Sequence, residues 1–317
     1  MRFVFVMDTL DRVNPVKDTT FAFIEAAQRR GHMSLHCLPT DLAVREGVPL
    51  ARVREIRCSE SAPRIALHGE PYELPLLEVD AVFIRKDPPF DADYLYATLL
   101  LEHARGGPLL VNDPRGLRDA NEKIYALQFP EWTPRTLVSA SREAIEAFVR
   151  DVGGKAVIKP VDLAGGAGVM QLDLADKNAR GIVEMLTNDG RRLAIVQEFL
   201  PDVTAGDKRV LLLDGEPLGA ILRVARSDDF RSNMRAGGRV EPTELTERER
   251  AMVRAMAPKL RQDGLVFVGL DVIGERLTEV NVTSPTGIQE LERFTGSKPA
   301  DKVIAWVEAQ RASRSTG

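Results

Sequence analysis

The sequence predicts an α/β protein whose first part is an open, mostly parallel sheet with helices packed around it. Residues 2–8, 33–38 and 81–84 are short apolar runs rich in β-branched and aromatic residues, which is typical of buried strands. Residues 21–32 lie between the first two runs and have the spacing of an amphipathic helix. Because strands and helices alternate, binding loops should lie beyond the carboxyl ends of the strands, where the charged loop RKDPPF (85–90) follows the third run.

The remainder of the chain mixes helices with strands and hairpins. Helices are predicted at 117–129, 141–153 and 246–264, strands at 155–160 and 191–201, and a hairpin at Asp214-Gly215. From 226 to 241 arginines and adjacent glycines interrupt the hydrophobic pattern, which is typical of a lid or binding loop. We therefore predict three domains, 1–118, 119–190 and 191–317, the third carrying a mobile loop at 226–241.

The overall composition gives the protein no general affinity for polyanions. Its 43 Lys and Arg against 47 Asp and Glu give a formal net charge of −4, so nucleic acid and membranes are not expected partners. No apolar run approaches the length of a membrane span, and residues 3–7 are too short for a signal-peptide core. The two cysteines, Cys37 and Cys58, fit a reducing compartment, so we expect a cytoplasmic location.

The segment GLDVIGERLTEVNV (269–282) predicts a strand hairpin that carries acidic residues on an apolar frame. A three-residue connection, 274–276, would pair Asp271 with Glu279 and leave Asn281 on the same face. Opposed carboxylates destabilise a sheet, so that face would need a cation, and Mg²⁺ bound with phosphates suits such oxygen ligands. A two-residue connection would put the carboxylates on opposite faces, one of them in solvent. The hairpin alone does not decide between the two.

A second group of residues is suited to phosphate. Lys159 ends an apolar strand, and Gly165, Gly166 and Gly168 follow it. Glycines let backbone N–H groups approach phosphate oxygens, while the lysine adds a positive charge. The chain has no Walker A motif, and Gln171 stands where a dinucleotide fingerprint needs its third glycine. A glycine-rich turn between two strands explains the same residues.

Two further stretches end apolar strands with polar residues. Residues 197–200, Gln-Glu-Phe-Leu, form a hinge of the kind that can hydrogen-bond a purine edge through its backbone. Asp207, Lys208 and Arg209 place three charges directly before the apolar run 210–213. An ordinary strand end and a surface ion cluster are the alternative interpretations.

In their order along the chain these pieces resemble the ATP-grasp superfamily, and more closely the bacterial glutathione synthetases. The resemblance spans nearly the whole chain. It rests on KDTTFA (17–22), RKDPPF (85–90), LRDANEK (117–123), VIKP (157–160), GDKRVLL (206–212) and FVGLDVIGERLTEVNVTSPTG (267–287). The resemblance implies an N-terminal Rossmann-like domain followed by a two-subdomain ATP-grasp fold, α+β in character.

The activity that the resemblance implies is the ATP-dependent ligation of γ-L-glutamyl-L-cysteine to glycine through an acyl phosphate, which gives glutathione, ADP and phosphate. It also implies Mg²⁺, or Mn²⁺ in its place, and a homotetramer. RKDPPF and NVTSPTG argue against other carboxylate–amine ligases of the superfamily, whose shared core does not require them. Retention of the lysines, the acidic pair and Arg209 argues against a regulatory module that binds ATP without turnover.

The site residues that the resemblance implies fall into five groups. The predicted catalytic residues are Arg209 and Lys159. The predicted ATP-binding residues are Lys123, Lys159, Gly165, Gly166, Gly168, Gln197, Glu198, Phe199, Leu200, Asp207 and Lys208. The predicted metal ligands are Asp271, Glu279 and Asn281. The predicted substrate-binding residues are Arg85, Arg209, Asn281, Ser284 and Thr286. The predicted lid includes Arg231, Asn233, Gly237 and Gly238.

Overall fold

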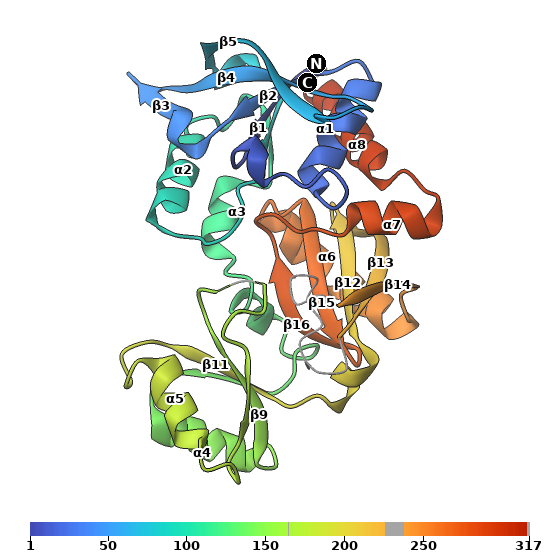
Figure 1. Cartoon of the computed structure of the whole chain (residues 1–317). Helices are drawn as coiled ribbons and strands as arrows, with labels where there is room; N and C mark the ends of the chain where they lie inside the picture. The colour runs from blue at the N-terminus through green and yellow to red at the C-terminus, as the bar shows by residue number, and fades with distance from the viewer. Residues whose placement is uncertain (164, 226–237, 316–317) are drawn as a thin grey trace.

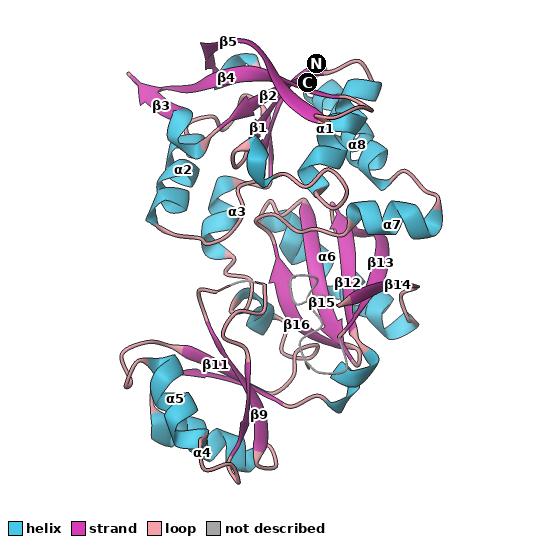
Figure 2. Cartoon of the chain, in the orientation of Figure 1, coloured by secondary structure: helices cyan, strands magenta, loops and turns pink. Residues whose placement is uncertain are grey.

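The computed structural model describes residues 1–163, 165–225 and 238–315, which form three sheets (Figure 1). A seven-stranded sheet has the order β3-β4-β2-β1-β6-β7, with β5 beside β4. A four-stranded sheet has the order β10-β9-β11-β8, and a five-stranded sheet has the order β14-β13-β12-β15-β16. Figure 2 shows that helices flank all three sheets. None of the helices in these ranges is long and apolar enough to cross a membrane.

The first sheet combines the predicted parallel core with an antiparallel extension. Strands β2, β1, β6 and β7 are parallel neighbours. The first three were predicted from their apolar runs, and β7 was not. Strands β3, β4 and β5 add to it in antiparallel fashion. They were not predicted, because apolar residues in them are mixed with charged residues and prolines and form no continuous run. The bounds are β1 Arg2–Val6, β2 Met33–Cys37, β3 Leu42–Arg45, β4 Val48–Cys58, β5 Ile65–Pro75, β6 Ala81–Ile84 and β7 Leu109–Val111.

The helices of this first domain include one from the far end of the chain. Helix α1 (Thr19–Arg29) starts at Asp18, whose side chain accepts a hydrogen bond from the backbone N–H of Phe21 at 2.8 Å. Helix α8 (Pro299–Ser315) packs against α1, so both termini lie together in Figure 1. The guanidinium of Arg29 lies 2.6 Å from the carboxylate of Asp301. The third predicted domain, 191–317, therefore ends with a helix that belongs to the first. The remaining helices here are α2 Ala92–Glu102 and α3 Pro114–Asp119.

The second sheet holds the predicted strand that ends in Lys159, but it extends beyond the predicted domain limit. Strand β11 pairs with both β8 and β9, so it is internal to this sheet. We therefore propose a boundary near residue 200 in place of 190. Helix α4 begins after Ser141, which caps it as predicted. The bounds are β8 Thr136–Ser139, α4 Arg142–Asp151, β9 Lys155–Pro160, β10 Met170–Asp173, α5 Ala179–Thr187 and β11 Ala194–Glu198.

The third sheet contains both predicted hairpins. Asp214 and Gly215 form the predicted turn between β12 and β13, with φ of 51° and 74°. Residues 239–241, predicted as the end of the mobile loop, instead begin β14. Residues 226–237 lie outside the described residues. The bounds are β12 Asp207–Leu213, β13 Glu216–Val224, β14 Arg239–Thr243, α6 Glu247–Gln262, β15 Phe267–Ile273, β16 Arg276–Asn281 and α7 Ile288–Thr295.

The predicted helix at 117–129 is wrong as a continuous element. Helix α3 ends at Asp119, and a 3-10 helix, η4 (Tyr125–Gln128), follows after a turn. The side-chain oxygen of Asn121 accepts hydrogen bonds from the backbone N–H groups of Lys123 and Ile124, both at 3.1 Å. Because this side chain satisfies the backbone groups locally, it competes with helix formation and leaves Lys123 in a turn. The other 3-10 helices are η1 Leu10–Arg12, η2 Pro39–Asp41, η3 Leu76–Glu78 and η5 Pro201–Ala205.

A buried amide joins the first sheet to the third. Asn112 follows β7, and its side-chain nitrogen donates to the carbonyls of Phe267 at 2.9 Å and Val282 at 2.8 Å. Its side-chain oxygen accepts from the backbone N–H of Phe267 at 2.7 Å. The residue is only 3 % exposed, so water cannot replace these bonds. Asn112 therefore fixes where β15 begins and where the chain leaves β16.

Replacing Asn112 with Ala should lower the free energy of unfolding by about 2–4 kcal/mol, because it leaves buried backbone groups without partners. Urea unfolding of the purified protein measures this. The matched control is Asn178→Ala, which removes an exposed amide whose hydrogen bond within the described ranges goes to Asp176. An Asn112→Ala variant as stable as the control would contradict this role.

Candidate active site

The acidic hairpin has the predicted pairing but not the predicted turn. Asp271 pairs with Glu279, and Gly269 pairs with Asn281. The connection is nevertheless two residues long, since Ile273 pairs with Arg276, and Gly274 and Glu275 both have positive φ (53° and 63°).

A bulge in β16 reconciles the two observations. The register shifts between Asp271 and Val272, so that Thr278 is the extra residue. The Thr278 hydroxyl donates to the backbone carbonyl of Asp271 at 3.1 Å. The predicted three-residue connection is therefore wrong. The bulge, instead of the turn length, brings Asp271 opposite Glu279.

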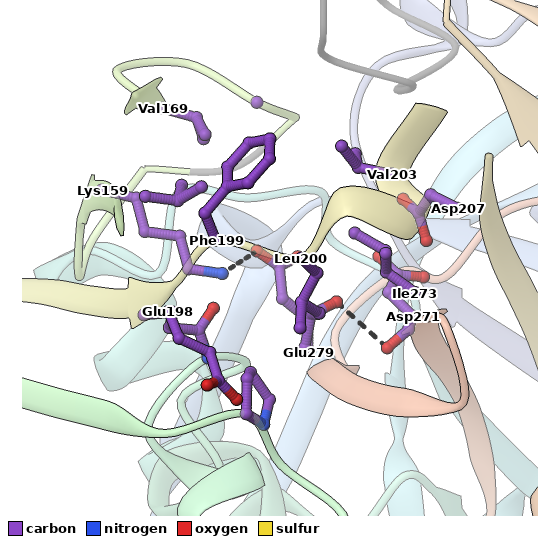
Figure 3. A pocket seen from close by; sticks show the side chains of 15 residues that line it. Lys159, Val169, Glu198, Phe199, Leu200, Val203, Asp207, Asp271, Ile273 and Glu279 are labelled. Atoms are coloured by element: carbon purple, nitrogen blue, oxygen red, sulfur yellow. Dashed lines mark hydrogen bonds and ion pairs between the residues drawn. The ribbon is translucent and has the colours of Figure 1, made fainter. Parts of the chain in front are cut away.

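Two lysines from other parts of the chain converge on Glu279. The Lys159 ammonium, at the end of β9, lies 3.4 Å from a Glu279 carboxylate oxygen (Figure 3). The Lys123 ammonium lies 4.0 Å from the same oxygen. The side chains of the two lysines are 6 % and 3 % exposed. Lys123 also donates to Leu163 O at 2.6 Å and to Glu122 at 2.5 Å. Two nearly buried cations thus lie beside one acidic hairpin, where they could also contact phosphate.

Asp271 is surrounded by cations from β12 and β13. Arg209 donates to both of its carboxylate oxygens, from Nε at 2.5 Å and Nη2 at 3.0 Å, and Arg223 lies 3.0 Å from one of them. Asn281 donates to the other at 3.2 Å. Burial alone would raise the pKa of Asp271, but the two guanidinium groups hold it well below the ordinary value. Asp271 is therefore ionised at any ordinary pH.

Asp207 faces the same pair of arginines but titrates differently. It forms a short ion pair with Arg223. Burial nevertheless raises the pKa of Asp207 to about 6, because desolvation outweighs the attraction of Arg223 and the nearby Asp271 adds repulsion. Asp207 thus becomes protonated under mildly acidic conditions.

The space between the second and third sheets forms a cleft beside these groups (Figure 3). It encloses about 770 Å³ when the open space at its mouth is included. Apolar side chains dominate one part of it and charged groups another. The lining includes Pro134, Val157, Lys159, Gly166, Val169, Gln197, Glu198, Phe199, Leu200, Val203, Asp207, Asp271, Ile273, Thr278 and Glu279. An apolar slot beside cations and carboxylates suits a base attached to phosphates.

A second cleft meets the first at Asp271 and Glu279. The N-terminal domain contributes Asp87 and Pro88 to its wall, and the third sheet contributes the rest of the charged groups except Glu122. The full lining is Asp87, Pro88, Glu122, Gly165, Arg209, Arg223, Asp271, Glu279, Asn281, Thr283, Ser284, Pro285 and Thr286. Two compartments with a shared acidic pair are suited to a transfer between two molecules.

Most of the predicted site residues line one of the two clefts. Lys123 lines neither cleft but contacts Glu279, which lines both. Gly168 belongs to the glycine loop at 165–168, and an added Cβ at this position would come within 2.8 Å of Pro160. Gly165 borders the second cleft and Gly166 the first, both with positive φ. This loop therefore separates the two compartments.

Two predicted residues lie elsewhere. The Lys208 ammonium donates to Glu249 at 2.8 Å and to Glu244 O at 2.9 Å, on the α6 side of the sheet. The prediction of Lys208 in the nucleotide site is wrong, because neighbouring residues of a strand face opposite sides. Arg85 is buried between domains and donates to Thr20 Oγ1 at 3.2 Å and Pro285 O at 3.1 Å, so it supports the loop at 284–286 without lining a cleft.

Most of the predicted lid falls in a part of the chain that the structure does not describe. Arg231, Asn233 and Gly237 lie outside the described residues, and Gly238 directly precedes β14.

Sequence reasoning missed three residues of the site. Arg223 is on β13, which pairs with β12, and only the hairpin register brings it to Asp207 and Asp271. Glu122 borders the second cleft; burial and the nearby Glu279 raise its pKa. Thr278 forms the bulge. For Arg223 the sequence offered one signal, namely that it lies in the strand predicted to pair with the one that begins with Asp207, Lys208 and Arg209.

Comparison with known proteins identifies the family. Two family models cover almost the whole chain: the prokaryotic glutathione synthetase N-terminal domain matches residues 1–118, and the prokaryotic glutathione synthetase ATP-grasp domain matches residues 122–296. The chain belongs to the prokaryotic glutathione synthetase family. Among curated members, the glutathione synthetase of Synechocystis sp. is 43 % identical over 98 % of this chain and 100 % of its own length. That of Synechococcus elongatus is 45 % identical over 98 % of both chains.

Solved structures share the fold of this glutathione synthetase family member at low identity. The D-cycloserine synthetase DcsG superposes with a TM-score of 0.66 at 16 % identity, over 99 % of this chain and 100 % of that one. The ATP-grasp ligase PsnB, solved with a minimal precursor, Mg and ADP, gives a TM-score of 0.61 at 18 % identity over 98 % of both chains. The predicted fold, an N-terminal sheet domain followed by an ATP-grasp unit, is confirmed.

The raised pKa of Asp207 predicts a pH-dependent effect of Asp207→Asn on stability. A carboxylate whose pKa rises on folding, from 3.8 to about 6, stabilises the folded state at low pH and loses that contribution as pH increases through about 6. An asparagine does not ionise, so the variant does not lose stability in this way as the pH rises. The stability of Asp207→Asn relative to the parent should therefore increase by up to about 3 kcal/mol between about pH 4 and about pH 7.

Urea unfolding at several pH values tests this, with the exposed Asp93→Asn as the control. Any difference between the asparagine and the protonated aspartic acid adds an offset that does not depend on pH. A stability difference that is flat across the range would contradict the raised pKa.

Proposed function

We propose that this chain joins γ-L-glutamyl-L-cysteine to glycine using ATP, with glutathione, ADP and phosphate as products. The observation that carries the proposal is that two clefts meet at Asp271 and Glu279, one suited to a nucleotide and the other open to a second substrate. Membership of the prokaryotic glutathione synthetase family makes the chain an ATP-dependent ligase and supports this choice of substrates.

The reaction divides into two transfers. The cysteine carboxylate of the dipeptide attacks the γ-phosphoryl group of ATP, which forms an acyl phosphate and releases ADP. The glycine amine then loses a proton and attacks the acyl carbon, and phosphate leaves. Since neither step needs a bond to the protein, catalysis rests on positioning and on electrostatic stabilisation of the transferred group.

The first cleft would hold the nucleotide. The base fits among Val157, Phe199 and Leu200, beside the backbone of the hinge that contains Gln197 and Glu198. Asp207, at the same cleft, is placed to contact the ribose. The phosphates would then lie toward the charged end of the cleft.

The groups proposed for the phosphates come from two sheets. Lys159 and Lys123 already lie beside Glu279, and they would exchange part of this contact for phosphate oxygens. The glycine loop at 165–168 offers backbone N–H groups at the boundary between the two clefts. This boundary is where a γ-phosphoryl group must cross.

The residues at the shared wall fit Mg²⁺. Asp271 and Glu279 supply two carboxylates and Asn281 an amide oxygen on one face of the hairpin. Within the described ranges no three His, Cys, Asp or Glu side chains cluster closely enough to hold a metal alone, so phosphate oxygens would complete the coordination. When bound, the metal would neutralise the phosphate charge. Mn²⁺, with the same preference for oxygen ligands, is proposed as a substitute.

The second cleft would hold the dipeptide with its cysteine carboxylate at the shared wall. Arg209 lies there and donates from Nη1 to Thr286 O at 3.2 Å, so its fork is fixed. A fixed guanidinium can stabilise the negative charge of an acyl phosphate. Arg223 adds a second buried cation. Asn281, Ser284 and Thr286 offer polar groups to the bound dipeptide.

Three further features remain proposals that rest on the family resemblance. These are a lid formed by the arginine-rich stretch that precedes β14, residues 226–238, a homotetrameric assembly and a cytoplasmic location. A lid would protect a water-sensitive acyl phosphate.

ADP formation by the purified protein should require ATP, γ-glutamylcysteine, glycine and Mg²⁺ together, because the acyl phosphate is consumed only when the amine is present. A coupled ADP assay with each component omitted in turn measures this, and mass spectrometry identifies glutathione. Formation of AMP and pyrophosphate, or turnover that does not respond to glycine, would contradict the proposal.

Glu279→Gln should reduce kcat by about a hundredfold or more while leaving the thermal midpoint within a few degrees, because the side chain is partly exposed and serves the phosphates more than the core. The same substitution at Glu275, in the turn of the same hairpin, provides the control. If Glu279→Gln unfolds the protein, or if both variants lose activity equally, the carboxylate has a structural role instead.

A further inference from the structure

The second cleft contains one carboxylate that lacks a cationic partner among the residues that the structure describes. Four acidic side chains line this cleft. Asp271 is paired with two arginines, Glu279 with Lys159, and Glu122 with Lys123 at 2.5 Å. Within the described ranges, the carboxylate of Asp87 makes no ion pair and no hydrogen bond. It is thus the one acidic group in the cleft whose charge this part of the protein does not pair.

The backbone of Asp87 is held rigidly although its side chain is not. Its N–H donates to the carboxylate of Asp8 at 3.0 Å, and its carbonyl accepts from the Lys86 ammonium at 2.6 Å. Lys86 also lies 3.2 Å from the other carboxylate oxygen of Asp8. These bonds fix the loop that follows β6 against the end of β1. The loop therefore holds the backbone of Asp87 in a defined position at the wall of the cleft.

The nearest buried cation does not neutralise Asp87. Arg85 is attracted more strongly to Asp18 than to Asp87, and its own hydrogen bonds go to Thr20 and Pro285. With Lys86 and its partner Asp8 included, two positive charges thus face three negative ones. An excess negative charge remains at the wall that the N-terminal domain contributes, and an ammonium group of the substrate would balance it.

We propose that Asp87 binds the α-ammonium group of the γ-glutamyl residue and so selects the dipeptide. This inference rests on the proposed function. Both substrates carry an ammonium group, but glycine must lose its proton at the acyl carbon, next to Arg209 and the shared wall. The α-ammonium of the dipeptide stays charged throughout and lies at the end remote from the reacting carboxylate. A lasting carboxylate–ammonium pair at the other domain therefore suits the dipeptide.

The pair would set specificity by orienting the substrate across the cleft. With the α-ammonium held on the N-terminal wall, the extended dipeptide directs its cysteine carboxylate toward the ATP-grasp wall. A substrate without the amine leaves Asp87 desolvated and unpaired, which is penalised more than the loss of an ordinary contact. Asp87 would then discriminate against N-glutaryl-L-cysteine, which differs from γ-glutamylcysteine only by lacking that amine.

The test compares these two substrates in the parent protein and in Asp87→Asn, at saturating ATP and glycine. The parent should have a KM about ten- to a hundredfold lower for γ-glutamylcysteine than for N-glutaryl-L-cysteine. In Asp87→Asn the KM for γ-glutamylcysteine should rise by about the same factor, and the preference should disappear. The KM values for glycine and ATP should remain within about threefold of the parent. The exposed Asp93→Asn, which removes one charge from the same domain, should behave like the parent.

Several results would overturn the proposal. Equal use of the two dipeptides by the parent protein would by itself reject the proposal. This result does not depend on whether Asp87→Asn folds. Retained discrimination in Asp87→Asn, or a rise confined to the KM for glycine or to the Mg²⁺ requirement, would also reject it. If the parent makes no glutathione at all, the proposed function fails first, and that outcome is distinct from the others.

Discussion

The site depends on the bulge in the β15–β16 hairpin. A two-residue turn without it would place Glu279 and Asp271 on opposite faces of the sheet, since side chains alternate along a strand. The extra residue, Thr278, restores the pairing and puts both carboxylates and Asn281 on one face. Lys159 from the second sheet and Arg209 from the third therefore each meet a carboxylate on this face. One inserted residue therefore determines where the two clefts meet.

Charge balance explains why the site can hold so many buried ionic groups. Each buried arginine or lysine around the hairpin has a carboxylate partner, and removing a fully buried partner such as Asp271 would leave a costly unpaired charge. Phosphates and a divalent cation bring charges of both signs, so a nucleotide complex can exchange partners without leaving any group unpaired. Asp207, whose pKa burial raises to about 6, is the least favourably ionised member of this set. A site built from ion pairs that can exchange partners is preorganised for the transfer of a charged phosphoryl group between two ligands.

The sequence predicted the elements better than their contacts. Apolar runs identified β1, β6 and β9, and the hinge, the lysines and the acidic hairpin were recognised as one site through the family resemblance. The bulge was not visible, because nothing in the local pattern marks Thr278 as unpaired. Arg223 was missed since it reaches Asp207 only through the β12–β13 register. Lys208 was assigned to the wrong face of β12, although it is adjacent to Arg209 and neighbouring residues of a strand face opposite sides. The packing of α8 on α1 joins residues that no local pattern connects.

The central claim is that the γ-phosphoryl group passes to the dipeptide carboxylate where the two clefts meet. Turnover of γ-glutamylcysteine labelled with ¹⁸O in its cysteine carboxylate tests this directly, with mass spectrometry of the released phosphate. An acyl phosphate requires one labelled oxygen to leave with the phosphate in each turnover, and ADP to carry none. Unlabelled phosphate, or label found in AMP, would show that the carboxylate is activated in another way and would contradict the account.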